Sequence, residues 1–547
     1  MINILIGIGG TGAKVVESAL YLLAAGAGDV GQVLVGLVDQ DNGNGNLART
    51  NELVEKLRTL RADWEPPRNN ALDWDARPED GGTPFLRTRI EPLFSRTAHW
   101  RPADADQGNL AQILGRTEMS DGEKALFDLL FRGEAASPAH EEQTMDLAEG
   151  YRGRAHVGSA ALLASLLIDN TALIDRLSEL LKQTTQGTEV RIFLAGSIFG
   201  GTGAAGFPTI ARKIDNLRKA TVGAGESRSV DGARVKLGGV MMLPYFGFKD
   251  GEAGSNVVRA GDLLPQSRIA LNFYHRLFDR EALFDRFYLA GWNELIQLNY
   301  HSAGSGNQHN PAMIPELVGA LAAIDFFGGA ARAAETAPLA SARKEAGFVD
   351  WADLPAGEAL KIDVENRLGQ LLRTAIWWRY RMEPAFDRRH KSLFGKEELR
   401  VGDIKQPWLR ELARDTVWDQ PTQDAREHLR GFFKGLLEWA AAMQLFINPE
   451  AGDPFRLWSL APVLDRCDRS QPTDPVALKE PPLAARDLDD EVLAKAAFED
   501  VLRGRDTARP TRTAGDLFAE LHASRKTIGK TRGMGRVLAA LHHAARV

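Results

Sequence analysis

The stretch Ser197-Ile-Phe-Gly-Gly-Thr-Gly-Ala-Ala-Gly-Phe-Pro208 connects an expected strand to an expected helix. Residues 191–196 form an apolar run typical of a buried strand, and the residues from Pro208 onward have the spacing of an amphipathic helix. Gly200, Gly201 and Gly203 allow a tight turn that directs several backbone N–H groups at one spot. Because the helix adds the positive end of its dipole, this turn is predicted to bind phosphate.

A second glycine turn lies near the N-terminus. Ile4-Leu-Ile-Gly-Ile8 predicts a buried strand, and Gly9-Gly-Thr-Gly12 leads from it into a helix. Gly7, Gly9 and Gly12 also match the GxGxxG fingerprint of dinucleotide-binding folds, and Asp39 supplies an acidic residue after the next apolar run. This turn alone leaves three interpretations open: a NAD or FAD site, a second phosphate-binding turn, or close packing of a helix on a strand.

The composition indicates an ordinary globular protein with two or three domains. Its 547 residues are 44% apolar and 26% charged, and they exceed what one hydrophobic core usually holds. The net charge of -6 gives no general nucleic-acid signature, and the single Cys467 excludes an internal disulfide and a cysteine-based zinc site. No apolar run reaches the ~18 residues of a membrane span, and Met1 leads into a strand without a signal peptide, so we expect a cytoplasmic protein.

The patterns of strand and helix divide the chain into three parts. Residues 1–42 and 151–346 predict an α/β domain with a doubly wound, mainly parallel sheet, because helical segments separate the expected strands. Residues 43–150 predict a mainly helical insertion, and residues 347–547 predict a mainly helical C-terminal domain. The tail after Glu520 is basic, which is typical either of a solvated helix face or of a site for an acidic partner.

The stretch 197–208 resembles the phosphate loop GGGTG(S/T)G of the tubulin/FtsZ superfamily, and it lacks the Gly-Lys-Ser/Thr of a Walker loop. Further stretches follow the same order along the chain as the segments of that superfamily. Gly153-Arg-Ala-His-Val-Gly158 resembles the third loop of FtsZ, which lies near the γ-phosphate. The segments around Asn293 and Asn310 resemble its sixth strand and the start of its central helix. Phe199 departs from the pattern, because it replaces the first glycine of the phosphate loop.

The resemblance implies a site for GTP or GDP, with Mg²⁺ as a candidate companion. From the two glycine turns and the resemblance together, the residues expected to bind nucleotide are Gly9, Gly10, Thr11, Gly12, Asp39, Gly153, Arg154, Gly200, Gly201, Thr202, Gly203, Asn293 and Asn310. Asn310 precedes a proline, so it also matches a plain helix N-cap. No residue pattern predicts a protein-held metal site.

In this superfamily GTP is hydrolysed when another subunit presents a pair of carboxylates to the γ-phosphate. The pair implied here is Asp350 and Asp353, which would orient the attacking water. Phe348 stands where the family has Asn, and the two carboxylates also match a helix-capping pair. The resemblance therefore implies that any GTPase activity would depend on assembly, and it leaves open whether hydrolysis occurs.

Three functions follow from these patterns. The first is a divergent bacterial tubulin-like protein that binds nucleotide and assembles or switches conformation with it. The second is a NAD- or FAD-dependent oxidoreductase that uses Gly7, Gly9, Gly12 and Asp39, and the third is a tubulin-like scaffold that binds nucleotide without hydrolysing it. We expect self-association or a protein partner through the helical C-terminal domain, and no nucleic-acid partner.

Overall fold

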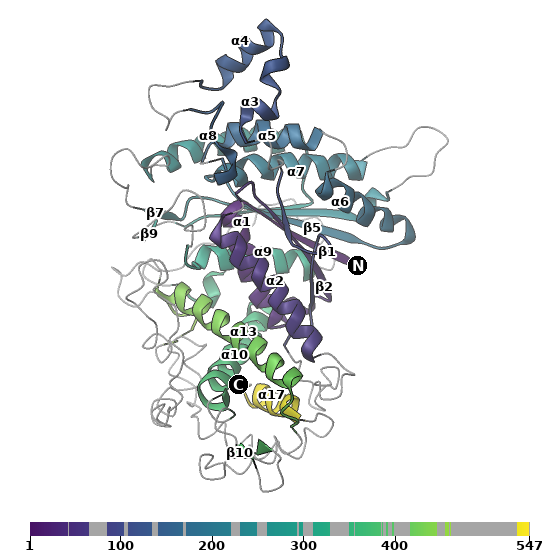
Figure 1. Cartoon of the computed structure of the whole chain (residues 1–547), viewed down its shortest axis with the longest axis vertical. Coiled ribbons are helices and arrows are strands. Elements are labelled where there is room, and N and C mark those ends of the chain that lie inside the picture. Colours follow the sequence, from purple (N-terminus) through teal and green to yellow (C-terminus); the bar gives the residue numbers. More distant parts are fainter. Residues whose placement is uncertain are drawn as a thin grey trace.

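The computed structural model describes residues 1–41, 43–64, 85–102, 108–133, 141–151, 153–167, 171–219, 230–248, 260–292, 295–298, 310–328, 349–354, 356–383, 386, 390–391, 397–398, 416–445, 455–458, 460 and 533–545. A seven-stranded sheet runs through the middle of these residues, with helices on both of its faces (Figure 1). Its strands are β1 (Ile2–Ile8), β2 (Gln32–Val38), β3 (Arg89–Pro92), β4 (His99–Trp100), β5 (Val190–Ser197), β6 (Val235–Met242) and β8 (Arg286–Ala290).

The strands lie in the order β3-β2-β1-β5-β6-β8, with β4 also paired to β2, and every pairing in this sheet is parallel. Every residue of β5 is buried, as expected for a parallel strand that is covered on both faces. The expectation of an α/β fold with a mainly parallel sheet is confirmed. A separate parallel pair joins β7 (Phe246–Phe248) to β9 (Ile296–Leu298).

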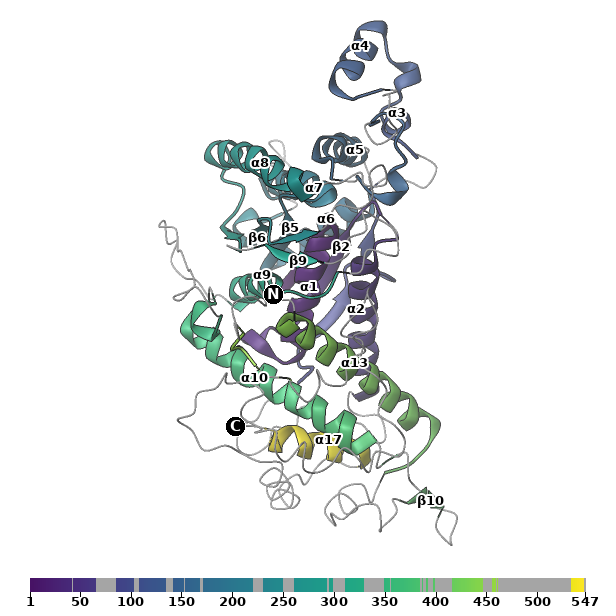
Figure 2. The same cartoon turned by 90° about the vertical axis from the view of Figure 1, so that its left-hand side faces the viewer.

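Two layers of helices cover the sheet (Figures 1 and 2). One layer holds α1 (Gly9–Ala24), α2 (Gly45–Trp64) and α9 (Ile314–Gly328). The other holds α5 (Ala155–Leu167), α6 (Ala172–Lys182), α7 (Gly201–Lys219) and α8 (Ala260–Arg280). Because α1 and α7 each begin where a neighbouring strand ends, both helix N-termini point to the carboxyl edge of the sheet.

The segment 43–150 differs from the separate helical insertion that the sequence predicts. Its first half supplies α2, β3 and β4 to the α/β domain, and both strands pair with β2. These strands are only four and two residues long, too short to show the alternation by which a strand is recognised in a sequence. Its second half contains α3 (Leu110–Ile113) and α4 (Asp121–Leu130), and α4 stands away from the body of the molecule (Figure 1).

The described part of the segment 347–547 consists mainly of helices, and it packs directly on the α/β domain. It contains α10 (Glu358–Trp377), α13 (Gln420–Leu445) and α17 (Gly533–Ala544). α13 lies against α2 and contacts α1 through Trp439, and α17 lies against α10 (Figure 2). In the basic tail, Leu538 and Leu541 are buried, so α17 is a packed helix and not a wholly solvated one.

Candidate functional site

The two glycine turns meet at the carboxyl edge of the sheet. β1 and β5 are neighbours, with Gly7 paired to Ala195, so the turns that follow these strands lie side by side. A Cβ atom built on Gly9 would lie 3.0 Å from the backbone nitrogen of Gly203. The strand order also reverses between β1 and β5, and such a switch point is where open α/β sheets bind ligands. The prediction that both turns share one edge is confirmed.

Some of these glycines are required because backbone segments approach closely. A Cβ on Gly12 would clash with the carbonyl oxygen of Ala195, and a Cβ on Gly203 would lie 2.9 Å from both the nitrogen and the oxygen of Ser197. Gly9 has a φ of 73°, a conformation that other residues rarely adopt. The close-packing interpretation therefore holds for Gly12 and Gly203, and it is compatible with a ligand role for their N–H groups.

Other glycines of the turns face side chains and not backbone atoms. Around Gly200, the only described atom within 4 Å of a built Cβ is the Ser197 hydroxyl, at 3.0 Å. A Cβ on Gly10 would lie 2.9 Å from the side-chain amide nitrogen of Asn44. The N-cap residue of α1 is Ile8, which provides no side-chain cap for the first-turn N–H groups. This arrangement suits an anion at the start of the helix.

A third segment, residues 151–154, lies beside the second turn. A Cβ on Gly201 would be 2.9 Å from the Tyr151 Cβ and 3.1 Å from the Gly153 nitrogen. Gly153 has a φ of 77°, and the backbone N–H of Arg154 donates to the Tyr151 carbonyl just before α5 begins. The Arg154 side chain turns to Glu142, with Nε 3.8 Å from Oε1. The structure thus brings Gly153 to the glycine turns and pairs the Arg154 charge with Glu142.

Asp39 links the end of β2 to the second glycine turn. Its Oδ1 accepts a hydrogen bond from the Thr202 hydroxyl at 2.7 Å, and its Oδ2 accepts one from the Asn44 amide at 3.2 Å. Burial raises the pKa of Asp39 to about 6, and the charge of Asp41 acts in the same direction against the Thr202 hydrogen bond. His99 Nε2 lies 3.0 Å from the Asp39 carbonyl oxygen. Asp39 is therefore a buried carboxylate engaged by neighbouring side chains.

Tyr151 brings a polar group to this site that the sequence does not reveal. Its side chain is buried, and its hydroxyl has no hydrogen-bond partner among the residues that the structure describes. Burial raises the pKa of this hydroxyl, and the charge of Asp39 adds to the effect. The Tyr151 Cβ lies beside Gly201, and its ring lies against Gly158 of α5. A buried hydroxyl without a partner is costly, so Tyr151 is a candidate donor to a ligand.

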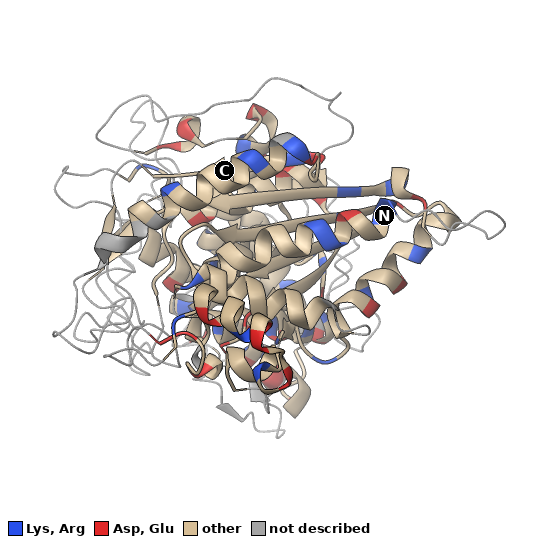
Figure 3. Ribbon diagram, turned by 90° about the horizontal axis from the view of Figure 1, so that it is seen from above, with Lys and Arg blue, Asp and Glu red and all other residues tan. Residues whose placement is uncertain are grey.

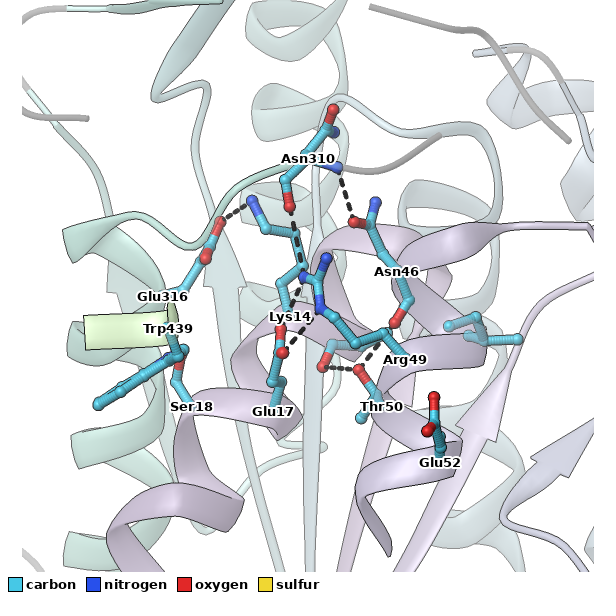
Figure 4. Close-up of polar contacts among 12 residues, drawn as sticks. Lys14, Glu17, Ser18, Asn46, Arg49, Thr50, Glu52, Asn310, Glu316 and Trp439 are labelled. Atoms are coloured by element: carbon cyan, nitrogen blue, oxygen red, sulfur yellow. Dashed lines mark hydrogen bonds and ion pairs between the residues drawn. The ribbon is translucent and has the colours of Figure 1, made fainter. Parts of the chain in front are cut away.

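Two asparagines connect the first turn to the start of α9 (Figure 4). The backbone N–H of Asn310 donates to Asn46 Oδ1 at 2.9 Å. Arg49 donates to the Asn310 carbonyl at 3.3 Å and to both carboxylate oxygens of Glu17. The structure therefore places Asn310 beside the start of α2. Asn44 and Asn46 lie in an Asn-Gly run that marks a change of composition in the sequence, and only the fold shows their contacts with the site.

A buried ion pair lies one turn further along α1. The Lys14 ammonium contacts the Glu316 carboxylate of α9, and the Tyr245 hydroxyl donates to that carboxylate at 2.6 Å. Tyr245 also interacts with the Thr11 side chain of the first glycine turn. Burial lowers the pKa of Lys14 and raises that of Glu316. This chain of contacts joins the glycine turn to α9.

Phe199, the residue that departs from the family loop, turns into an aromatic cluster. Its ring centroid lies 5.8 Å from that of Tyr245 and 5.4 Å from that of Phe246, both in edge-on contact. The Phe199 side chain is buried. Replacing the first glycine therefore adds apolar packing next to the turn.

Asp350 and Asp353 cap a short helical turn of their own, Trp351–Asp353. Asp350 accepts a hydrogen bond from the Ala352 N–H at 2.7 Å, and Asp353 accepts one from the Asp350 N–H at 3.0 Å. Lys361, in the first turn of α10, donates to the Ala352 carbonyl, and Asp363 of the next turn accepts from the Gly28 N–H. Gly28 follows the C-terminal end of α1, so the pair lies at the opposite end of α1 from the glycine turns.

Further observations bear on ligands. Asn293 lies outside the described residues. Within the described part of the chain, no group of three or more His, Cys, Asp or Glu side chains could hold a metal ion. No helix in that part is long and apolar enough to cross a bilayer.

Comparison with known proteins finds no matching family model, no matching curated protein and no matching solved structure.

Proposed function

We propose that this chain is a tubulin-like protein that binds GTP or GDP where the two glycine turns meet, and that it assembles or changes conformation with the nucleotide bound. The observation that carries the proposal is the contact between Gly9 and Gly203 at the switch point of the sheet. Two helix N-termini converge there, and each adds partial positive charge and free N–H donors. Such a protein would act in the cytoplasm.

The residues present fit a chain of phosphates. The backbone N–H groups of residues 10–12 and 201–203 would hold the phosphate oxygens, and the Tyr151 hydroxyl would donate to one of them. A Mg²⁺ ion would be held chiefly by the phosphates, which is the usual arrangement for this ion and agrees with the lack of a carboxylate cluster among the described residues. Bound Mg²⁺ would neutralise phosphate charge.

Hydrolysis would need a second copy of the chain. α1 has 16 residues and is therefore about 24 Å long, so Asp350 and Asp353 at its far end do not reach a nucleotide held at its N-terminus. A neighbouring subunit is the remaining route by which this pair would orient water. Both carboxylates also hold backbone N–H groups of their own turn, so the proposed turnover is slow.

The oxidoreductase alternative has support from the strand order and from Gly7, Gly9 and Gly12. In such folds the acidic residue after the second strand binds ribose hydroxyls. Here the Asp39 carboxylate is buried and accepts hydrogen bonds from Thr202 and Asn44. The phosphate proposal accounts for Thr202 and the second turn, whereas the oxidoreductase alternative does not.

The first experiment is to identify the nucleotide released when the purified protein is denatured, by anion-exchange chromatography with mass detection. GTP or GDP supports the proposal, and NAD or FAD overturns it in favour of the oxidoreductase. The static scaffold differs from the leading proposal in turnover, since its specific GTPase activity would stay at zero as protein concentration rises.

The second experiment compares Gly200→Asp with Gly200→Asn. Gly200 has a negative φ and little around its Cβ position, so both side chains fit and the fold is retained. The aspartate places a negative charge beside the phosphates, and we expect binding of labelled GTP to weaken about 100-fold or more relative to the asparagine variant. Equal affinity in the two variants would exclude phosphate from this turn.

A further inference from the structure

Arg101 brings a positive charge to the carboxyl edge of the sheet. The parallel register of β2 with β4 pairs Val38 with Trp100, and the Asp39 N–H donates to the Trp100 carbonyl at 3.4 Å. This hydrogen bond continues the register by one pair, so Arg101 lies opposite Asp39 and both side chains start on the same face of the sheet. His99, two residues before Arg101, reaches the Asp39 carbonyl oxygen from this face.

The Arg101 guanidinium is not engaged by a carboxylate. Arg101 forms no ion pair in the part of the chain that the structure describes, and its Nε is buried without a hydrogen-bond partner. The carboxylate oxygens of Asp39 accept hydrogen bonds from Thr202 and Asn44. Other basic side chains around the glycine turns each have an acidic neighbour: Lys14 contacts Glu316, Arg49 contacts Glu17, and Arg154 lies 3.8 Å from Glu142.

The Tyr151 hydroxyl is a second group without a partner at this edge. The Tyr151 side chain is 1% exposed, and its hydroxyl has no hydrogen-bond partner among the described residues. Burial raises the pKa of this hydroxyl, the charge of Asp39 adds to the effect, and the charge of Arg101 opposes it. Both charges are therefore close enough to act on the hydroxyl, which places Tyr151 and Arg101 around the same carboxylate.

A chain of phosphates needs a cation that the glycine turns do not supply, because helix N-termini contribute only partial charges. Basic and acidic side chains are interspersed over the described ribbon, and no broad basic surface is seen in the view of Figure 3. The cation therefore has to be a local side chain. A guanidinium can bind phosphate through two parallel N–H···O bonds, and a terminal phosphate offers three free oxygens and a charge near -2.

We propose that Arg101 binds the terminal phosphate of a nucleoside triphosphate, with the Tyr151 hydroxyl as a second donor, and that this contact makes the site prefer a triphosphate to a diphosphate. The inference rests on the nucleotide site proposed above and adds to it a charged side chain from the segment 43–150. Since the Arg101 Nε and the Tyr151 hydroxyl bind no other described group, replacing either residue removes a ligand contact without breaking an internal hydrogen bond.

The test is isothermal titration calorimetry of the full-length protein, freed of nucleotide, with GTP, GDP and inorganic tripolyphosphate at one Mg²⁺ concentration. Arg101→Met is expected to weaken binding of GTP and tripolyphosphate about 10- to 100-fold and binding of GDP by less than about threefold. Tyr151→Phe is expected to weaken binding of GTP about three- to tenfold. Arg58→Gln is the matched control, because it removes the same charge about 20 Å along α2 from the start of that helix and leaves all three affinities unchanged.

Thermal melts of the ligand-free variants separate binding from folding. Arg101→Met and Tyr151→Phe are expected to melt within about 2 °C of the wild type or above it. A melting temperature of Arg101→Met that is lower by more than about 5 °C assigns the residue to the fold and overturns the proposal.

The binding outcomes distinguish this proposal from the proposed function. Wild-type affinity for GTP in Arg101→Met, or an equal loss for GTP and GDP, overturns the role of Arg101 and leaves the nucleotide site in place. If the wild type binds tripolyphosphate but neither nucleotide, the proposed function fails, and a loss of tripolyphosphate binding in Arg101→Met still supports the phosphate contact. A wild type that binds none of the three overturns both.

Discussion

The two ends of α1 are packed in opposite ways. Its first turns lie among glycines, buried asparagines and the Lys14–Glu316 ion pair. Its last turns lie against aromatic side chains of α13: the ring of Tyr21 is 5.1 Å from that of Trp439 and 6.0 Å from that of Phe432. Buried charge adds little net stability, whereas apolar burial adds much. One helix thus has a polar, glycine-lined end, where we propose that a ligand binds, and an aromatic end that packs on α13.

The largest expected effect at the polar end comes from Lys14→Met. The substitution leaves the Glu316 carboxylate buried without its ion-pair partner, which typically costs about 3–5 kcal/mol. Urea unfolding followed by tryptophan fluorescence measures the loss. The double variant Lys14→Met with Glu316→Leu is expected to recover most of it, because an apolar pair needs no solvation. If the single variant is as stable as the wild type, Glu316 does not depend on Lys14 as a buried ion-pair partner.

Asp39 predicts a dependence of stability on pH. The pKa of Asp39 in the folded protein, about 6, lies above its value in the unfolded chain. The carboxyl group therefore contributes fully to the free energy of unfolding below about pH 4, where it is protonated in both states, and this contribution is lost as the pH rises through 6. The ligand-free wild type is therefore expected to lose up to about 3 kcal/mol from this group between pH 4 and pH 8. Asp39→Asn does not titrate, so the difference between variant and wild type should grow with pH in thermal melts. A difference that is constant with pH contradicts the burial of an ionisable carboxylate.

The stabilities of two alanine variants show which glycine of the second turn is packed against backbone and which has space for a side chain. Gly203→Ala would place a methyl group 2.9 Å from the Ser197 backbone, and we expect a loss of about 1–3 kcal/mol. Gly200→Ala meets only the rotatable Ser197 hydroxyl, so a change within about 0.5 kcal/mol is expected. Denaturant midpoints measure both. Similar losses in the two variants show that the turn is crowded throughout.

A modest effect is expected at the aromatic end. Trp439→Phe keeps the aromatic packing with Tyr21 and removes the indole N–H that donates to the Ser18 hydroxyl at 3.1 Å. We expect a loss of about 1–2 kcal/mol in urea unfolding. Combined with Ser18→Ala in a double-mutant cycle, the variant isolates the hydrogen bond. A coupling of zero assigns the whole effect to packing.

Much of the site could be predicted from the sequence because its signals are local. A strand, a glycine turn and a helix follow one another within about 30 residues or fewer at Ile2–Ala24 and again at Val190–Lys219. The rest depends on distant contacts. The hydrogen bond of Thr202 to Asp39 joins residues 163 positions apart, and neither residue indicates the other in the sequence. Tyr151 is an ordinary tyrosine in the sequence, and only the fold buries it next to Gly201.

The sequence by itself determined the two glycine turns and the parallel α/β sheet, because backbone conformation and apolar periodicity are properties of adjacent residues. Only the tertiary structure decided that β3 and β4 belong to that sheet, that α13 packs on α1, and that Asp350 and Asp353 lie at the far end of α1. Short strands and helix faces have several possible partners of similar chemistry. Which partner each one takes depends on how the whole chain buries its apolar surface and satisfies its buried polar groups.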